Sequence, residues 1–200
     1  MVAINVAEIC PQTRVLGPGR RFVIWVQGCC FHCPGCIAPD WIPRQPATLI
    51  EAEDLADWIL SVPDLDGVTV SGGEPMLQAA ALSELLTHLR QKRDFSLICY
   101  SGFTLEQLQA QGDRNSDRLL SLLDVLIDGL YVEGLNDGRG WRGSSNQRIH
   151  FLTPRHAQDA AAFSHRPRQV EVHLRRDSAL LVGIPPRAVS QALHRAIADS

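Results

Sequence analysis

Val26-Gln-Gly-Cys-Cys-Phe-His-Cys-Pro-Gly-Cys36 is the stretch that decides the fold, because it places three cysteines at C-x3-C-x2-C spacing. It continues residues 22–26, an apolar and β-branched run that predicts a buried strand. Cys29, Cys33 and Cys36 are therefore expected on one tight loop directly after a strand. Three thiolates suit the iron of a cubane cluster, and such a loop leaves one iron of four open to a substrate. We predict a [4Fe-4S] cluster held by these cysteines.

The six cysteines of the chain allow two other interpretations. Disulfides fit poorly, because four of the cysteines fall within one short stretch, where small loops would strain most pairings. A structural zinc site normally takes four ligands, so Cys30, His32 or Cys10 would have to complete it. We expect Cys30 to be a spacer residue, and Cys10 and Cys99 to be small core residues.

Length and charge limit the remaining classes of function. The chain has 200 residues, which fits one domain, so we expect residues 1–200 to fold as a unit. Its 19 basic and 22 acidic side chains nearly cancel and give no overall attraction to nucleic acid. The sequence shows no signal-peptide pattern and no run of about 18 uncharged apolar residues. A cytoplasmic protein that binds neither nucleic acid nor a membrane is expected.

Short apolar runs alternate with helical patterns along the chain. Residues 22–26, 67–70, 95–99 and 125–127 predict strands, with helical patterns between them. This alternation predicts an α/β fold with a mainly parallel sheet, which crossovers of one hand can curl into a full or partial barrel. Ligands of such folds gather at the carboxyl ends of the strands.

Local signals predict where helices begin. Thr48 with Glu51, and Thr104 with Gln107, match the capping box, in which a hydroxyl and a side chain three residues later satisfy free helix amides reciprocally. We expect helices to begin at both places. Residues 76–91 are typical of a further amphipathic helix.

The last third of the chain carries different signals. The glycine-rich residues 134–147 lack periodicity and predict a long loop with a binding role or mobility. Val170–Leu174 and Ala179–Gly183, joined by a polar turn, predict a C-terminal hairpin. The proline pair at 185–186 precedes a final helix that is expected to reach about Ile197.

The cysteine spacing after a strand resembles the signature of the radical S-adenosylmethionine (SAM) superfamily. Its context, Arg21-Phe-Val-Ile-Trp-Val-Gln-Gly-Cys29 and Cys33-Pro-Gly-Cys36, is similar to the small activating proteins of anaerobic ribonucleotide reductase, from about Leu16 to His150. The resemblance implies a partial (β/α)6-type radical SAM barrel. The chain has no further C-x2-C sets, which fits the type with a single cluster.

Val68-Thr-Val-Ser-Gly-Gly-Glu-Pro75 is a strand that ends in two glycines and an acid. Taken alone, it is typical of a tight turn that begins a helix. By the resemblance, Gly72, Gly73 and Glu74 hold the methionyl ammonium of SAM, and the glycines let the ligand approach the main chain.

The resemblance also implies the remaining SAM contacts. The backbone around Gly35 and Ile37 is expected near the adenine, Ser101 near the ribose, and Asp128 near the SAM site. The alternative for Asp124 and Asp128 is that both simply end a strand. No catalytic side chain is expected beyond the cluster and SAM.

The activity that the resemblance implies is installation of a glycyl radical. An external one-electron donor such as flavodoxin or ferredoxin reduces the cluster, and SAM splits into methionine and a 5'-deoxyadenosyl radical. That radical removes the α-hydrogen of a glycine in a partner such as anaerobic ribonucleotide reductase. Arg142 and Arg148 lie in a stretch similar to a segment of the same activating proteins and are candidates for contacting the partner, although surface arginines are more often simply solvated.

Two other functions remain open from the sequence. One is a radical SAM enzyme that acts on a small molecule or a peptide. The other is a non-catalytic iron-sulfur or zinc module.

Overall fold

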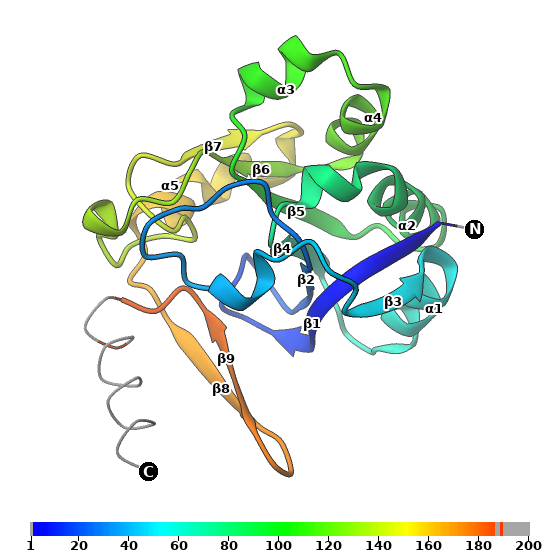
Figure 1. The fold of residues 1–200 in the computed structure, drawn as a ribbon, viewed down its shortest axis with the longest axis horizontal. Coiled ribbons are helices and arrows are strands. Elements are labelled where there is room, and N and C mark those ends of the chain that lie inside the picture. The colour runs from blue at the N-terminus through cyan, green and yellow to red at the C-terminus, as the bar shows by residue number, and fades with distance from the viewer. Residues whose placement is uncertain (1, 187–188, 190–200) are drawn as a thin grey trace.

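A seven-stranded sheet forms the centre of the molecule in the computed structural model, which describes residues 2–186 and 189 (Figure 1). The strand order is β3-β1-β2-β4-β5-β6-β7. Strands β2, β4, β5 and β6 pair in parallel, whereas β1, β3 and β7 join the sheet antiparallel. The bounds are β1 Ala3–Thr13, β2 Arg21–Val26, β3 Thr48–Glu51, β4 Gly67–Gly72, β5 Ser96–Ser101, β6 Val125–Asp128 and β7 Arg148–Phe151.

The four parallel strands are the four that the apolar runs predict, so the α/β class with a mostly parallel central sheet is confirmed. The pairing order leaves β3 and β7 as edges of the sheet. Strand β1 has no continuous apolar run. Ile4 and Val6 are buried while their neighbours are less so, and Pro11 and the polar residues near its end hide this alternation.

Helices cover the sheet, and the alternation of side chains along each strand decides which cluster a residue joins. Phe22, Ile24 and Val26 of β2 pack in the main core with α1 and α2, while Val23 and Trp25 belong to a second cluster. The helices are α1 Ala52–Ser61, α2 Ala79–Lys92, α3 Leu105–Gln111, α4 Arg114–Leu122 and α5 Ala160–His165. Short 3-10 helices are η1 Pro39–Trp41, η2 Pro75–Gln78, η3 Glu133–Leu135 and η4 Pro154–Asp159.

The expected helix start at Thr48 is wrong, because residues Thr48–Glu51 form strand β3. They pair with the first residues of β1, from Val6 opposite Thr48 to Ala3 opposite Glu51. Helix α1 begins only at Ala52, and no side chain caps it. Hydrogen bonds to β1 therefore determine the local structure of these residues. A short capping pattern does not predict such pairing with a distant segment.

The second capping box is confirmed at the start of α3. Thr104 Oγ1 accepts a hydrogen bond from Gln107 N at 3.2 Å, and Gln107 Oε1 accepts one from Thr104 N at 2.8 Å. The helix expected over 76–91 is also present, as η2 followed by α2.

Replacing Thr104 by Ala is expected to lower the free energy of unfolding by about 1 kcal/mol, because Gln107 N loses its side-chain acceptor. Urea unfolding measures the change. Thr104→Ser keeps the hydroxyl and is the matched control. Equal stabilities of the Ala and Ser variants would contradict a stabilising role for this cap.

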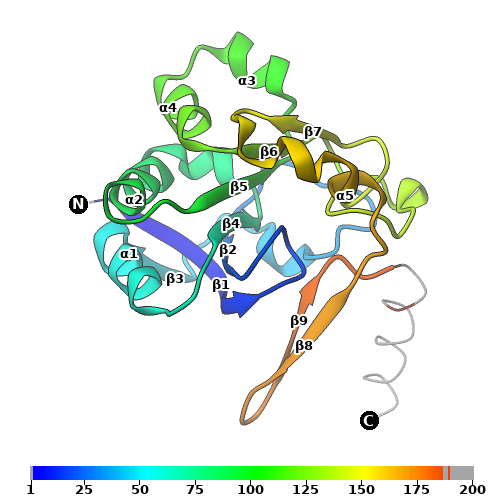
Figure 2. The same ribbon diagram turned by 180° about the vertical axis from the view of Figure 1, so that it is seen from behind.

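The C-terminal hairpin is confirmed with the predicted bounds, as β8 Val170–Leu174 and β9 Ala179–Gly183. It forms a separate two-stranded sheet and extends from the body of the molecule (Figures 1 and 2). The final helix expected after the proline pair falls mostly outside the described residues. Within the part that is described, no helix is long and apolar enough to cross a membrane.

Candidate functional site

A cavity of about 380 Å³ lies at the carboxyl ends of the parallel strands. This is the edge of the sheet where α/β folds bind their ligands. The cavity brings together predicted site residues that are far apart in the sequence. Those that line it are Cys29, Cys33, Cys36, Ile37, Gly72, Gly73 and Ser101.

The cysteine loop leaves the end of β2 and returns beside its own start. Gly28, with φ +97°, takes the left-handed conformation that glycine adopts without strain. Its N–H donates to the carbonyl of Trp41 at 2.9 Å, and the N–H of Cys29 donates to the carbonyl of Ile42 at 2.9 Å. Backbone hydrogen bonds to Trp41 and Ile42 therefore hold the start of the loop, including Cys29, in place.

Gln27 holds the base of this loop, a role that sequence reasoning missed. Its side-chain amide donates to the carbonyls of Asp40 at 3.2 Å and Pro43 at 2.8 Å. Its own carbonyl accepts from Gln78 Nε2 at 3.0 Å, and its N–H donates to the carbonyl of Asn5. The signal available in the sequence was a polar residue placed between an apolar strand and the first cysteine.

The three cysteines line one cavity. Among the described residues, no three His, Cys, Asp or Glu side chains form a group that could hold one metal ion. In a [4Fe-4S] cubane each cysteine thiolate binds a different iron, so three cysteines around one cavity fit a cluster with one iron left open. Burial raises the pKa of the Cys29 and Cys33 thiols, so binding of iron must displace their protons.

Close packing of the main chain requires glycine at Gly72, the last residue of β4, and at Gly73, which follows it. A Cβ on Gly73 would lie 2.2 Å from the carbonyl oxygen of Gly28, and one on Gly72 would lie 2.4 Å from the nitrogen of Val26. The N–H of Gly73 donates to the carbonyl of Val26 at 2.7 Å. These glycines therefore let β4 approach β2 and the start of the cysteine loop closely.

Glu74 follows Gly73 in the chain and is not itself a lining residue of the cavity. It is fully buried. Its carboxylate accepts from Met76 N at 2.9 Å, Ser101 Oγ at 2.9 Å and Gly102 N at 2.7 Å. Burial raises the pKa of this carboxyl from 4.5 to about 7, although the three hydrogen bonds oppose the shift. Glu74 thus ties the ends of β4 and β5 together.

Gly35 and Ile37 lie in the same loop but differ in exposure to the cavity. Ile37 is 45% exposed and lines it, whereas Gly35 is not among the lining residues. Gly35 has φ +72°, and a Cβ there would lie within 3 Å of the Glu133 side chain. Its glycine identity therefore follows from a tight turn against a neighbouring segment.

Asp128 is the last residue of β6, directly before Gly129, which lines the cavity. It is fully buried at the end of β6 and is not a lining residue. Its carboxylate accepts from Leu105 N at 2.6 Å, and pairs with Arg148 at 2.9 Å and His150 at 2.8 Å. The carboxylate thus joins β6 to the start of α3 and to β7, a structural role that only the three-dimensional pairing reveals.

Aromatic residues also line the cavity, and no local sequence pattern predicts them. Trp25 of β2 and Trp41 of the returning loop have ring centroids 5.6 Å apart. Phe31, Tyr100 and Tyr131 complete this lining. The cavity that contains the three cysteines therefore has a largely aromatic wall.

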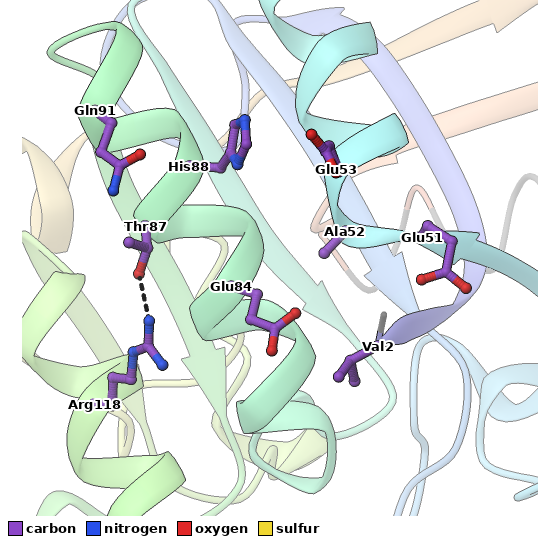
Figure 3. A pocket seen from close by; sticks show the side chains of 9 residues that line it. All are labelled: Val2, Glu51, Ala52, Glu53, Glu84, Thr87, His88, Gln91 and Arg118. Atoms are coloured by element: carbon purple, nitrogen blue, oxygen red, sulfur yellow. Dashed lines mark hydrogen bonds between the residues drawn. The ribbon is translucent and has the colours of Figure 1, made fainter.

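A second cavity, of about 240 Å³, lies between the start of β1 and the helices α1, α2 and α4 (Figure 3). Its side chains are mostly polar, with Glu51, Glu53, Glu84 and His88 among them. It contains none of the predicted site residues. The cavity at the strand ends is therefore the candidate site.

Three features together are typical of an iron-sulfur protein of the radical SAM type. They are the mostly parallel sheet, the three loop cysteines after β2 and the glycine pair at the end of β4. Comparison with known proteins agrees. A family model described as a 4Fe-4S single cluster domain matches residues 15–150.

Curated relatives give the particular family. The anaerobic ribonucleoside-triphosphate reductase-activating protein of Vibrio cholerae is 33% identical over 158 residues, covering 75% of this chain and 99% of its own length. Its namesakes in Escherichia coli K12 and phage T4 are both 31% identical, covering 74% and 73% of this chain and 99% and 93% of their own lengths. The chain belongs to this family of activating proteins. It is a radical SAM enzyme whose cofactors are a [4Fe-4S] cluster and SAM.

Proposed function

We propose that this protein installs a glycyl radical on a partner enzyme, an anaerobic ribonucleoside-triphosphate reductase. The observation that carries the proposal is that Cys29, Cys33 and Cys36 share one cavity with Gly72 and Gly73 at the strand ends. A cluster and a SAM molecule bound there would lie next to each other. The relatives named above are activating proteins for this reductase, which supports the choice of partner.

The residues of the chain would divide the work as follows. Cys29, Cys33 and Cys36 bind three irons, and the backbone at Gly72 and Gly73 approaches SAM. A reduced cluster held by the three cysteines would supply the one electron needed for reductive cleavage of SAM, and SAM held beside it would supply the group that abstracts the glycine α-hydrogen, giving methionine, 5'-deoxyadenosine and a glycyl radical as products.

Two further groups prepare the site for this chemistry. The buried Glu74 carboxylate orients Ser101 and the N–H of Gly102 at the end of β5. Trp25 and Trp41 line the cavity and would reduce the access of water to a reactive intermediate bound there. No side-chain acid or base is needed, because a hydrogen atom moves rather than a proton.

We also propose that residues 1–200 act as a single radical SAM domain. The parallel strands β2, β4, β5 and β6 would correspond to part of a (β/α)6-type barrel, with the crossover helices on the outside. An external one-electron donor of the flavodoxin or ferredoxin type would supply the electron.

Electron paramagnetic resonance tests the function directly. The reduced, iron-loaded protein with SAM and the reductase from the same organism is expected to give a glycine-centred doublet. Deuterium placed at the α-carbon of the target glycine is expected to appear in 5'-deoxyadenosine. Efficient turnover of a small molecule without any partner protein would contradict the proposal, and failure to cleave SAM after reduction would favour a non-catalytic iron-sulfur module.

A further inference from the structure

The C-terminal hairpin has two faces of different character. Residues directly opposite each other in an antiparallel pair share a face. The register pairs Glu171 with Val182 and His173 with Leu180, and it pairs Val172 with Leu181 and Leu174 with Ala179. We call the first set the inner face (Glu171, His173, Leu180, Val182) and the second set the outer face (Val172, Leu174, Ala179, Leu181).

The inner face fixes the hairpin on β1 and the loop that follows it. The Glu171 carboxylate accepts from Thr13 Oγ1 at 2.6 Å and from Arg14 N at 3.0 Å. Arg175, in the turn of the hairpin, makes a two-pronged ion pair with Glu8, at 2.8 and 2.9 Å. Val182 is fully buried in the cluster that contains Trp25. The hairpin is thus held in a defined position.

The outer face is apolar, and its strand β8 side is open to solvent. Val172 is 58% exposed and Leu174 is 83% exposed, although burial of these apolar side chains would be favourable. All four residues of the outer face are apolar. Exposed apolar surface of this kind marks protein contact sites.

The hairpin is continuous with the wall of the cavity. Leu181 of the outer face and Leu180 of the inner face line the cavity, together with Gly183, Ile184 and Pro185, which follow them in the chain. An apolar path therefore leads from the exposed Leu174 end of the hairpin to the cavity that contains the three cysteines. A chain segment lying along this path would reach the site where hydrogen abstraction takes place.

We infer that the outer face of the hairpin docks the glycine-bearing segment of the partner enzyme and guides it into the cavity. The inference rests on the proposed function, and it specifies an extended polypeptide segment with apolar side chains flanking the glycine. The family model ends at residue 150, before the hairpin begins, while it includes all three cysteines.

The test uses a double variant, Val172→Glu with Leu174→Glu, in the iron-loaded protein. Both side chains are exposed, so the fold and iron content are expected to be unchanged. SAM cleavage without the reductase is expected to persist, while the reductase concentration that gives half-maximal glycyl radical rises at least about tenfold. Leu49→Glu is the matched control, because Leu49 is a strand leucine that is 62% exposed on the edge strand β3.

A photoreactive amino acid at position 174 gives a second measurement. It is expected to cross-link to the segment of the reductase that carries the glycine. Wild-type dependence on reductase concentration in the double variant would overturn the inference, and so would a cross-link to residues 187–200 of the same chain, since that segment would then cover the face. If the unaltered protein forms no glycyl radical at all, the proposed function fails, and the docking role fails with it.

Discussion

Replacing Cys29, Cys33 or Cys36 by Ala is expected to remove the cluster and abolish SAM cleavage. All three thiols line the same cavity, and each would be the sole protein ligand of one iron. The loop offers no substitute in the right place, because its remaining cysteine, Cys30, is not among the cavity-lining residues. Iron analysis after anaerobic reconstitution is expected to fall from about four irons per chain to near zero.

Cys30→Ala is the control for this prediction, since it changes the same loop without touching the cavity wall. Its iron content and its rate of SAM cleavage are expected to match those of the unaltered protein. Loss of the cluster in Cys30→Ala, to the same extent as in Cys33→Ala, would show that the three ligands are wrongly assigned.

The central strands could be predicted because each is buried on both faces and is therefore a continuous apolar run. Val23 and Ile24 illustrate this, since they are neighbours in β2 that pack in different clusters and are both fully buried. Strand β1 and the short edge strands carry no such run. Their structure depends on pairing with distant segments, which also explains why Thr48 is in a strand rather than at a helix cap.

For the candidate site too, local sequence patterns could be predicted, whereas contacts between distant segments could not. The cysteines were predictable because their spacing lies within one short loop. The hydrogen-bond partners of Asp128 were not predictable, because Arg148 and His150 come from β7, which pairs with β6 only in the folded chain. The same holds for Gly73, whose missing side chain is explained by the carbonyl of Gly28 rather than by a ligand alone.

This changes how the SAM pocket is best tested. A bulky residue at Gly73 would push against the backbone of the cysteine loop, so Gly73→Val is expected to disturb the cluster as well as SAM binding. Glu74 allows a more selective experiment. Its side chain makes hydrogen bonds near the ends of β4 and β5, and among the described residues it makes none to a cysteine side chain.

Replacing Glu74 by Ala is expected to lower SAM affinity, at a cost of roughly 1.5 to 3 kcal/mol, because Ser101 and Gly102 lose the acceptor that positions them. The free energy of unfolding is expected to fall by about 3 kcal/mol or more, since three buried donors lose their partner. Glu74→Gln keeps the shape and one acceptor oxygen, so it is expected to lose less of both. Calorimetric titration with SAM and urea unfolding measure the two effects.

The pH dependence of stability identifies the carboxyl group itself. Burial raises the pKa of Glu74 to about 7 in the folded protein, against 4.5 when it is exposed. Between these values the folded chain holds a proton that the unfolded chain has released, so this contribution to stability is complete below pH 4.5 and is lost as the pH rises to about 7. The loss amounts to roughly 3 kcal/mol. In Glu74→Gln, which cannot titrate, this part of the pH dependence of stability is expected to vanish. If it persists unchanged in this variant, another group is responsible for it. An unchanged SAM affinity in Glu74→Ala would show that the carboxylate of Glu74 is not part of the SAM site.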